Sequence, residues 1–212
     1  MAKERLKSPR VRLFVALDLP EPVLDRFVAW QEDTFADRRD LRLVPKYSIH
    51  VTLAFLGYQA ERDAERIAEV AFGDGAAPFA LRPTELVEVP PRRPRLYAVS
   101  LDDVGERLTG WQGALAGRLQ EAGFYEPEKR PFWPHLTVAR FKNTERHRTG
   151  GGARAGGRGG RGAGAPAAEP MPELPDELTE PFEAARLTLY QSTLKPQGAV
   201  YDPLARKPLG GG

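Results

Sequence analysis

Apolar residues along the chain switch between strand-like runs and helical spacing in the same order twice. Each time, an apolar run rich in β-branched residues precedes a stretch with apolar residues at helical spacing, and a second short run follows. These segments are residues 12–17, 23–35 and 50–55 in the first copy, and residues 95–101, 108–124 and 135–140 in the second. The pattern predicts two strand–helix–strand units offset by roughly 84 residues. We expect further elements in the form of a helix at 60–72 and strands at 79–89, 182–194 and 200–204.

The last run of each unit begins with a histidine followed two positions later by a threonine. The two copies read His50-Val51-Thr52-Leu53 and His135-Leu136-Thr137-Val138, and they contain two of the three histidines in the chain. Because side chains alternate along a strand, each histidine shares a face with its threonine while the apolar neighbours point inward. Two units related by an approximate two-fold axis would bring both pairs to one cleft.

Two imidazoles and two hydroxyls suit acid–base chemistry on a phosphate. Histidine titrates near neutral pH, so a pair can supply a general base and a general acid together. Oriented hydroxyls are suitable donors to non-bridging phosphate oxygens. The chain has no cysteine, which excludes disulfides, a thiol nucleophile and thiolate zinc sites, and no cluster of carboxylates marks a magnesium site. We therefore expect no metal and no cofactor.

An anionic substrate would then be bound by hydroxyls, imidazolium and arginine. Arg140 lies five residues after His135, although regular alternation would place it on the opposite face of the strand unless the strand twists or bulges. Phe14, Phe132 and Trp133 are candidates for stacking on a nucleobase or, alternatively, for core packing. Further basic candidates are Arg92, Arg93, Arg95, Lys129 and Arg130.

Charge is unevenly distributed over the 212 residues. The formal net charge is +2, yet residues 148–164 carry four arginines and no acid, so the remainder of the chain is net negative. We interpret 148–180 as a flexible Gly/Arg/Pro-rich insertion, because glycine loses the most entropy on ordering and nothing there can be buried to offset it. Its Arg-Gly repeats favour either a weak RNA-binding arm or a solvated linker.

The ends and the surroundings of the protein are also predicted. We expect a basic N-terminal tail at 1–10, a folded domain at 11–204 and a C-terminal tail at 205–212. With 41% hydrophobic and 28% charged residues, the composition is typical of a globular protein. No apolar run is long enough for a membrane span or a signal peptide, so we expect a cytoplasmic monomer without membrane contact.

The doubled His-x-Thr motif resembles the signature of the 2H phosphoesterase superfamily. Further stretches are similar to the RNA 2',3'-cyclic phosphodiesterases, also called 2'-5' RNA ligase-like proteins: Arg12–Leu17, Thr52–Gly57, Pro134–Arg140 and Leu189–Ser192. The resemblance covers about residues 12–204. It implies an α+β fold of two pseudo-symmetric lobes, each an antiparallel sheet with helices on its outer face, and an active-site cleft between the lobes.

The resemblance also implies a reaction. A 2',3'-cyclic phosphate at an RNA end, or on a nucleotide, would be opened without a metal to give a 2'-phosphate. His50 and His135 would be catalytic, with His135 acting on water and His50 on the leaving oxygen. Thr52, Thr137, Arg140, Phe14 and Trp133 would bind the substrate.

Three other functions stay open at this point. A ligase would run the same chemistry in reverse with the same residues and join RNA ends through a 2'-5' linkage. A non-catalytic RNA-binding protein would use the Arg-Gly segment instead of the histidines. A zinc hydrolase is the weakest alternative, because two histidines without cysteine or an evident carboxylate ligand leave the coordination incomplete.

Overall fold

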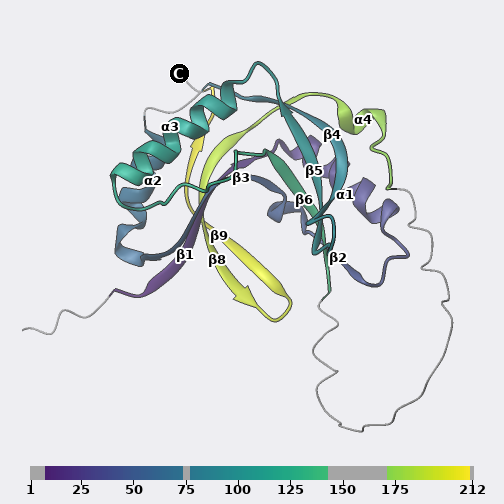
Figure 1. The fold of residues 1–212 in the computed structure, drawn as a ribbon, viewed down its shortest axis with the longest axis horizontal. Coiled ribbons are helices and arrows are strands. Elements are labelled where there is room, and N and C mark those ends of the chain that lie inside the picture. The colour runs from purple at the N-terminus through teal and green to yellow at the C-terminus, as the bar shows by residue number, and fades with distance from the viewer. Residues whose placement is uncertain (1–7, 74–76, 143–170, 211–212) are drawn as a thin grey trace, which may run out of the picture.

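A computed structural model describes residues 8–73, 77–142 and 171–210 (Figure 1). In these residues, nine strands form one antiparallel sheet in the order β7-β4-β5-β6-β3-β1-β8-β9, with β2 beside β6. The strands are β1 (Arg10–Asp18), β2 (Leu41–Leu43), β3 (His50–Ala60), β4 (Ala80–Val89), β5 (Leu96–Asp103), β6 (His135–Phe141), β7 (Phe182–Glu183), β8 (Arg186–Lys195) and β9 (Gly198–Pro208). The predicted α+β class with antiparallel pairing is confirmed.

The predicted lobes are two halves of this curled sheet. One half contains β1, β3, β8 and β9, and the other contains β2, β4, β5, β6 and β7. Only one residue pair, Val51 with Leu136, joins β3 to β6 at the boundary between the halves. Both residues follow directly after the two histidines, so the junction itself brings His50 and His135 close together.

The helices cover the outer side of the arched sheet (Figure 1). They are α1 (Glu21–Thr34), α2 (Ala64–Phe72), α3 (Arg107–Glu121) and α4 (Asp176–Thr179), with short 3-10 turns η1 (Lys46–Ser48) and η2 (Glu61–Asp63). The apolar spacing predicted for α1 produces a buried stripe of Val23, Leu24 and Phe27, as expected for an amphipathic surface helix.

Each long helix crosses to the half of the sheet that its own first strand does not occupy. Helix α1 follows β1 but packs against β6, whereas α3 follows β5 and contacts it but packs mainly against α2. The side chain of Arg118 in α3 donates to the carbonyls of Val70 and Ala71 in α2, and Gln112 Nε2 donates to the carbonyl of Leu53 in β3. The two sequence units therefore interlock, and neither lobe is built from one unit alone.

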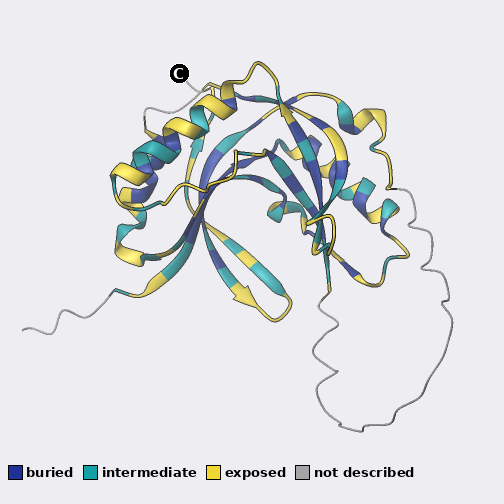
Figure 2. Ribbon diagram, in the orientation of Figure 1, coloured by how far each residue is buried: buried dark blue, intermediate teal, exposed yellow. Residues whose placement is uncertain are grey.

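Buried residues gather in the central strands of the sheet, whereas the tip of the β8–β9 hairpin is exposed (Figure 2). A large apolar cluster, which includes Leu13, Val15 and Leu17 of β1, lies between the sheet and its helices. The alternate residues Phe14 and Ala16 belong to a small cluster with Tyr190 on the opposite face. Strand β1 is thus buried on both faces, which explains why its sequence is a continuous apolar run.

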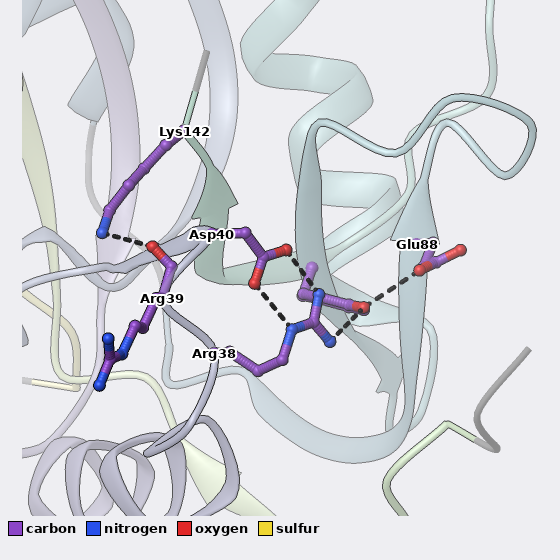
Figure 3. Close-up of polar contacts among 6 residues, drawn as sticks. Arg38, Arg39, Asp40, Glu88 and Lys142 are labelled. Carbon is purple, nitrogen blue, oxygen red and sulfur yellow. Dashed lines mark hydrogen bonds and ion pairs between the residues drawn. The ribbon is translucent and has the colours of Figure 1, made fainter. Parts of the chain in front are cut away.

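Strand β2 is held against the sheet by polar contacts just before it begins (Figure 3). Arg38 donates two hydrogen bonds to the carboxylate of Asp40, both 2.9 Å long. This pairing holds the pKa of Asp40 below its usual value. The same guanidinium lies over the ring of Tyr97 in β5, whose hydroxyl donates to Glu88 in β4. This network anchors the loop that leads into β2.

The structure changes several predicted boundaries. The strand expected at 182–194 is two strands, β7 and β8, and the short strand expected at 200–204 is the long β9. Strand β9 continues to Pro208, past the predicted start of the C-terminal tail, and α4 lies inside the predicted insertion 148–180. Residues 143–170, which carry the Arg-Gly repeats and His147, lie outside the described residues.

Candidate functional site

A pocket of about 180 Å³ opens where the two halves of the sheet meet. Both predicted pairs line it: His50 and Thr52 from β3, and His135 and Thr137 from β6. The other lining residues are Arg12, Phe14, Val44, Ser48, Phe55, Arg140, Ser192 and Tyr201. The structure therefore brings both motifs of the sequence repeat into one site.

Arg140 lines this pocket because β6 contains a bulge. Thr137 pairs with Ala98 of β5, whereas Ala139 pairs with the very next residue, Tyr97, so Val138 is an extra residue. Such a residue reverses the alternation of side chains beyond it. The strand therefore bulges, which is the exception to regular alternation that the sequence leaves open, and the bulge places Arg140 on the same side of β6 as His135.

Strand β3 has the same irregularity at the matching position. Thr52 pairs with Ala16 of β1 and Ala54 pairs with Val15, which leaves Leu53 as the extra residue. Beyond this bulge, Phe55 turns toward the pocket, five residues after His50, as Arg140 does five residues after His135. At equivalent positions, β3 therefore presents the ring of Phe55 to the pocket and β6 presents the guanidinium of Arg140.

His135 is held in one tautomer by a residue just before its strand. Its Nδ1–H donates to the carbonyl oxygen of Trp133 at 2.8 Å, so Nε2 is left with a free lone pair. The indole of Trp133 stacks on the imidazole with ring centroids 4.2 Å apart. Burial lowers the pKa of His135 below its ordinary value and the Arg140 cation lowers it further, while the bond to Trp133 acts in the opposite direction. The ring is therefore neutral at neutral pH.

His50 lies in an aromatic enclosure. Phe14 stacks on its ring at 4.9 Å, and Tyr201 meets it edge-on at 5.3 Å. Burial lowers the pKa of His50 to about 4, against the opposing effects of the Asp18 carboxylate and the Ser48 backbone. The Ser48 contact falls short of a well-formed hydrogen bond, and Nδ1 of His50 has no other partner among the described residues.

Asp18 is a buried carboxylate directly opposite His50 in the pairing of β1 with β3. It accepts hydrogen bonds from Arg186 Nε at 2.7 Å, Thr188 Oγ1 at 2.8 Å and the Tyr190 hydroxyl at 2.9 Å. Burial and this carboxylate raise the pKa of Tyr190. The cluster holds the Asp18 carboxylate beside His50 and supports the ring of Tyr190, which stacks on Phe14.

The two aromatic candidates have different surroundings. Phe14 is 3% exposed and lies between the rings of His50 and Tyr190, so it supports His50 and offers no open face for stacking. Trp133 is 39% exposed and lines a second, adjoining pocket of about 410 Å³ together with Phe132, Tyr125 and other residues. Of the other basic candidates, Arg130 lines this second pocket. Arg92, Arg93, Arg95 and Lys129 line neither pocket.

Several pocket residues were not singled out as site residues from the sequence. Arg12 lies 4.4 Å from the ring of Phe55 and adds a second cation to the pocket. Ser192 and Tyr201 are paired across the β8–β9 hairpin and form another wall. Arg12 and Ser192 belong to stretches that carry the family resemblance, so that signal was present. No sequence signal marked Tyr201 or Asp18 as site residues: Tyr201 lies within a predicted strand, and Asp18 directly follows one.

Two wider properties concern the described residues. They include no group of three or more histidine, cysteine, aspartate or glutamate side chains placed to hold a metal ion. None of their helices has the length and apolar character needed to cross a membrane.

Comparisons with known proteins find similarity over most of the chain. A family model described as LigT-like phosphoesterase matches residues 17–96, which include the first motif. The RNA 2',3'-cyclic phosphodiesterase of Methanocaldococcus jannaschii is 24% identical over 196 residues, which are 91% of this chain and 97% of that protein. The protein of the same name from Aeropyrum pernix is 29% identical over 166 residues, 77% of this chain and 84% of that protein. The chain is thus similar to the LigT-like phosphoesterases over residues 17–96 and to proteins named RNA 2',3'-cyclic phosphodiesterase over most of its length.

The fold of this chain matches a solved structure over nearly its whole length. The crystal structure of TT0787 of Thermus thermophilus has a TM-score of 0.70 and 26% identity, and the match covers 94% of this chain and 98% of that one. The curled antiparallel sheet is therefore the expected frame for the two motifs.

Proposed function

We propose that this protein is a LigT-like phosphoesterase that opens the 2',3'-cyclic phosphate at an RNA end to a 2'-phosphate, by paired acid–base catalysis without a metal. The observation that carries the proposal is the convergence of His50, Thr52, His135, Thr137 and Arg140 on one pocket. Relatives named RNA 2',3'-cyclic phosphodiesterase support the choice of substrate.

The charges in the pocket suit a cyclic phosphodiester, which carries one negative charge. Arg140 and Arg12 are cations, and Thr52 and Thr137 present hydroxyls that can donate to its non-bridging oxygens. Within the described residues, no carboxylate lines the pocket, so no side chain of the lining repels an anion. Positioning and charge stabilisation are the main needs of phosphoryl transfer, and these side chains supply both.

The surroundings of the two imidazoles favour different roles. The fixed tautomer of His135 directs an unprotonated Nε2 into the pocket, which suits a base that takes a proton from water. Burial lowers the pKa of His50 to about 4 in the free protein, but the Asp18 carboxylate favours the protonated form, and a bound anionic phosphate would favour it further. His50 would then be protonated when the substrate binds, which suits an acid that protonates the departing 3' oxygen. The water oxygen bonds to phosphorus as the bond to the 3' oxygen breaks, and the phosphate stays on the 2' oxygen. Exchange with solvent then returns both imidazoles to their starting states.

Trp133 is the residue best placed to stack on the nucleobase. It is exposed, and its ring lies directly beside His135 at the entrance to the second pocket. The imidazole of His135 would then lie close to both the stacked base and the reacting phosphate. The contribution of such stacking to the binding of single-stranded RNA is about 1–3 kcal/mol per base.

The proposal is tested by incubating the protein with adenosine 2',3'-cyclic phosphate in excess chelator and following the product by phosphorus NMR. We expect 2'-AMP, no turnover of the 3',5'-cyclic isomer, and a loss of at least about 10²-fold in His50→Ala and in His135→Ala. Melting temperatures show whether the variants remain folded. Exclusive formation of 3'-AMP, abolition of turnover by the chelator, or near-normal turnover in either folded variant would contradict the proposal.

A further inference from the structure

Arg42 of β2 lies directly opposite Arg140 of β6 in the antiparallel pairing of these strands. Directly opposite residues project from the same face of a sheet, with Cβ atoms about 4.5–5.5 Å apart. Because Arg140 lines the catalytic pocket, Arg42 lies beside that pocket, and it is exposed to solvent. Two like charges opposite each other destabilise a strand pair unless a counter-charge lies between them.

No such counter-charge comes from the described part of the chain. Among those residues, neither Arg42 nor Arg140 forms an ion pair. Among nearby cations, Arg38 pairs with Asp40, and Lys46 pairs with Glu21 and Asp25, whereas Lys142 donates to the carbonyl of Arg39. The two arginines on the pocket face therefore have no acidic partner among the described residues.

The guanidinium of Arg42 is also fixed in place. It donates a hydrogen bond to the carbonyl of Gln197 at the tip of the β8–β9 hairpin. A Cβ atom added at Gly198, where φ is +129°, would lie 3.0 Å from the guanidinium carbon, so glycine permits this close approach. The same hairpin contributes the pocket residues Ser192 and Tyr201. Arg42 thus lies at the rim of the pocket, between β6 and the hairpin.

We infer that Arg42, next to Arg140, binds a second phosphate of the substrate: the one attached to the 5' oxygen of the terminal nucleoside. This inference rests on the proposed function, since it places the cyclic phosphate between the histidines. Guanidinium groups bind phosphate through paired hydrogen bonds, and Arg42 has donors left beyond the one that Gln197 occupies. An RNA end, or a nucleotide with a 5'-phosphate, then has a contact that a simple nucleoside cyclic phosphate lacks.

Three substrates test this inference: adenosine 2',3'-cyclic phosphate, the same compound with a 5'-phosphate, and a dinucleotide that ends in the cyclic phosphate. For the unchanged protein we expect kcat/KM to be on the order of tenfold higher for the second and third substrates than for the first, as expected for one charge-assisted contact. In Arg42→Ala this advantage should disappear, while kcat/KM for the first substrate stays within about twofold. The advantage should also shrink with added salt, because Arg42 must displace salt cations from the phosphate in order to bind it.

Arg62→Ala is the matched control, because it removes an exposed arginine from η2 that lines neither pocket. It should keep the full advantage, and Arg42→Lys should keep part of it. An equal loss on all three substrates in Arg42→Ala would show that Arg42 acts by holding the hairpin, and would overturn the inference. So would an unchanged preference. An advantage for the dinucleotide alone would overturn it too, by placing the contact on the second nucleoside instead of the phosphate. Absence of turnover on every substrate in the unchanged protein would instead refute the proposed function.

Discussion

Leu53 of β3 and Val138 of β6 occupy the same place in the two halves of the site. Each is the extra residue of a bulge that follows a His-x-Thr motif by one position. Both are fully or nearly fully buried, so each bulge is held by the apolar core. Thr52 and Phe55 of one strand, and Thr137 and Arg140 of the other, line the pocket. The approximate symmetry therefore includes the irregularities of the strands as well as the motifs.

Arg140 faces the pocket only because of its bulge, and it should contribute to phosphate binding. We expect Arg140→Ala to lower kcat/KM for adenosine 2',3'-cyclic phosphate by about 10- to 100-fold, as for the loss of one charge-assisted hydrogen-bond donor. Arg140→Lys should recover part of this loss, since the point charge remains. Steady-state kinetics measure both effects.

The control for Arg140 is Arg93→Ala, which removes an exposed arginine outside both pockets. It should have near-normal kinetics. If Arg140→Ala is equally active, Arg140 does not contact the substrate.

Asp18 should tune His50 without touching the substrate. Its carboxylate raises the pKa of His50, so Asp18→Asn should lower that pKa further and reduce the fraction of protonated acid. An NMR titration of the histidine ring signals measures this shift directly. The variant should also lose about 1–3 kcal/mol of stability, because Arg186 loses its ionic partner and the buried hydrogen bonds to Thr188 and Tyr190 weaken.

Tyr190→Phe separates these effects. It removes one hydrogen bond to Asp18 but keeps the carboxylate and the ring that stacks on Phe14. The pKa of His50 should then change less than in Asp18→Asn. An equal shift in both variants would mean that packing, and not the charge of Asp18, sets the pKa.

Stability should depend on pH through His50. Its pKa is about 4 in the folded protein and about 6.5 when the chain is unfolded, so the unfolded chain binds the proton first as pH falls. The free energy of unfolding should therefore decrease between about pH 6.5 and pH 4, and His135, whose pKa is also lowered, adds to the decrease. Denaturant unfolding of the unchanged protein and of His50→Gln at several pH values measures this slope.

The variant lacks the titrating ring, so its stability should fall less steeply over the same range. The slope, and not the absolute stability, is the quantity to compare, because glutamine changes the packing around Phe14 at every pH. Equal slopes in the two proteins would contradict a lowered pKa for His50.

Much of this architecture could be predicted from local patterns. The run at 12–17, the apolar spacing at 23–35 and the two His-x-Thr motifs predicted strand β1, helix α1 and the pairing of His50 with His135 in one pocket. These features depend on periodicity within a segment, which sequence displays directly.

The remaining features depend on partners that are distant along the chain. The bulges at Leu53 and Val138 follow from how β3 and β6 align with β1 and β5, and a single strand does not reveal that register. Phe14 lies opposite Phe55, and Leu96 lies opposite Arg140, so Phe14 and Leu96 occupy equivalent positions in the two halves. Matching the two runs by sequence would instead make Phe14 equivalent to Tyr97. The charge of Asp18 behind His50 likewise requires β8 to lie beside β1, although Arg186 is 168 positions from Asp18 along the chain.

The central proposal is that His50 acts as the acid and His135 as the base, and a sulfur substitution in the substrate tests it most directly. A substrate whose 3' oxygen is replaced by sulfur has a leaving group that needs little protonation, while water must still lose a proton. We predict that His50→Ala, slow on the oxygen substrate, turns over the sulfur substrate at a rate within about tenfold of the unchanged protein, whereas His135→Ala stays slow on both. Rescue of His135→Ala instead, or rescue of neither variant, would contradict the assignment of His50 as the acid and His135 as the base.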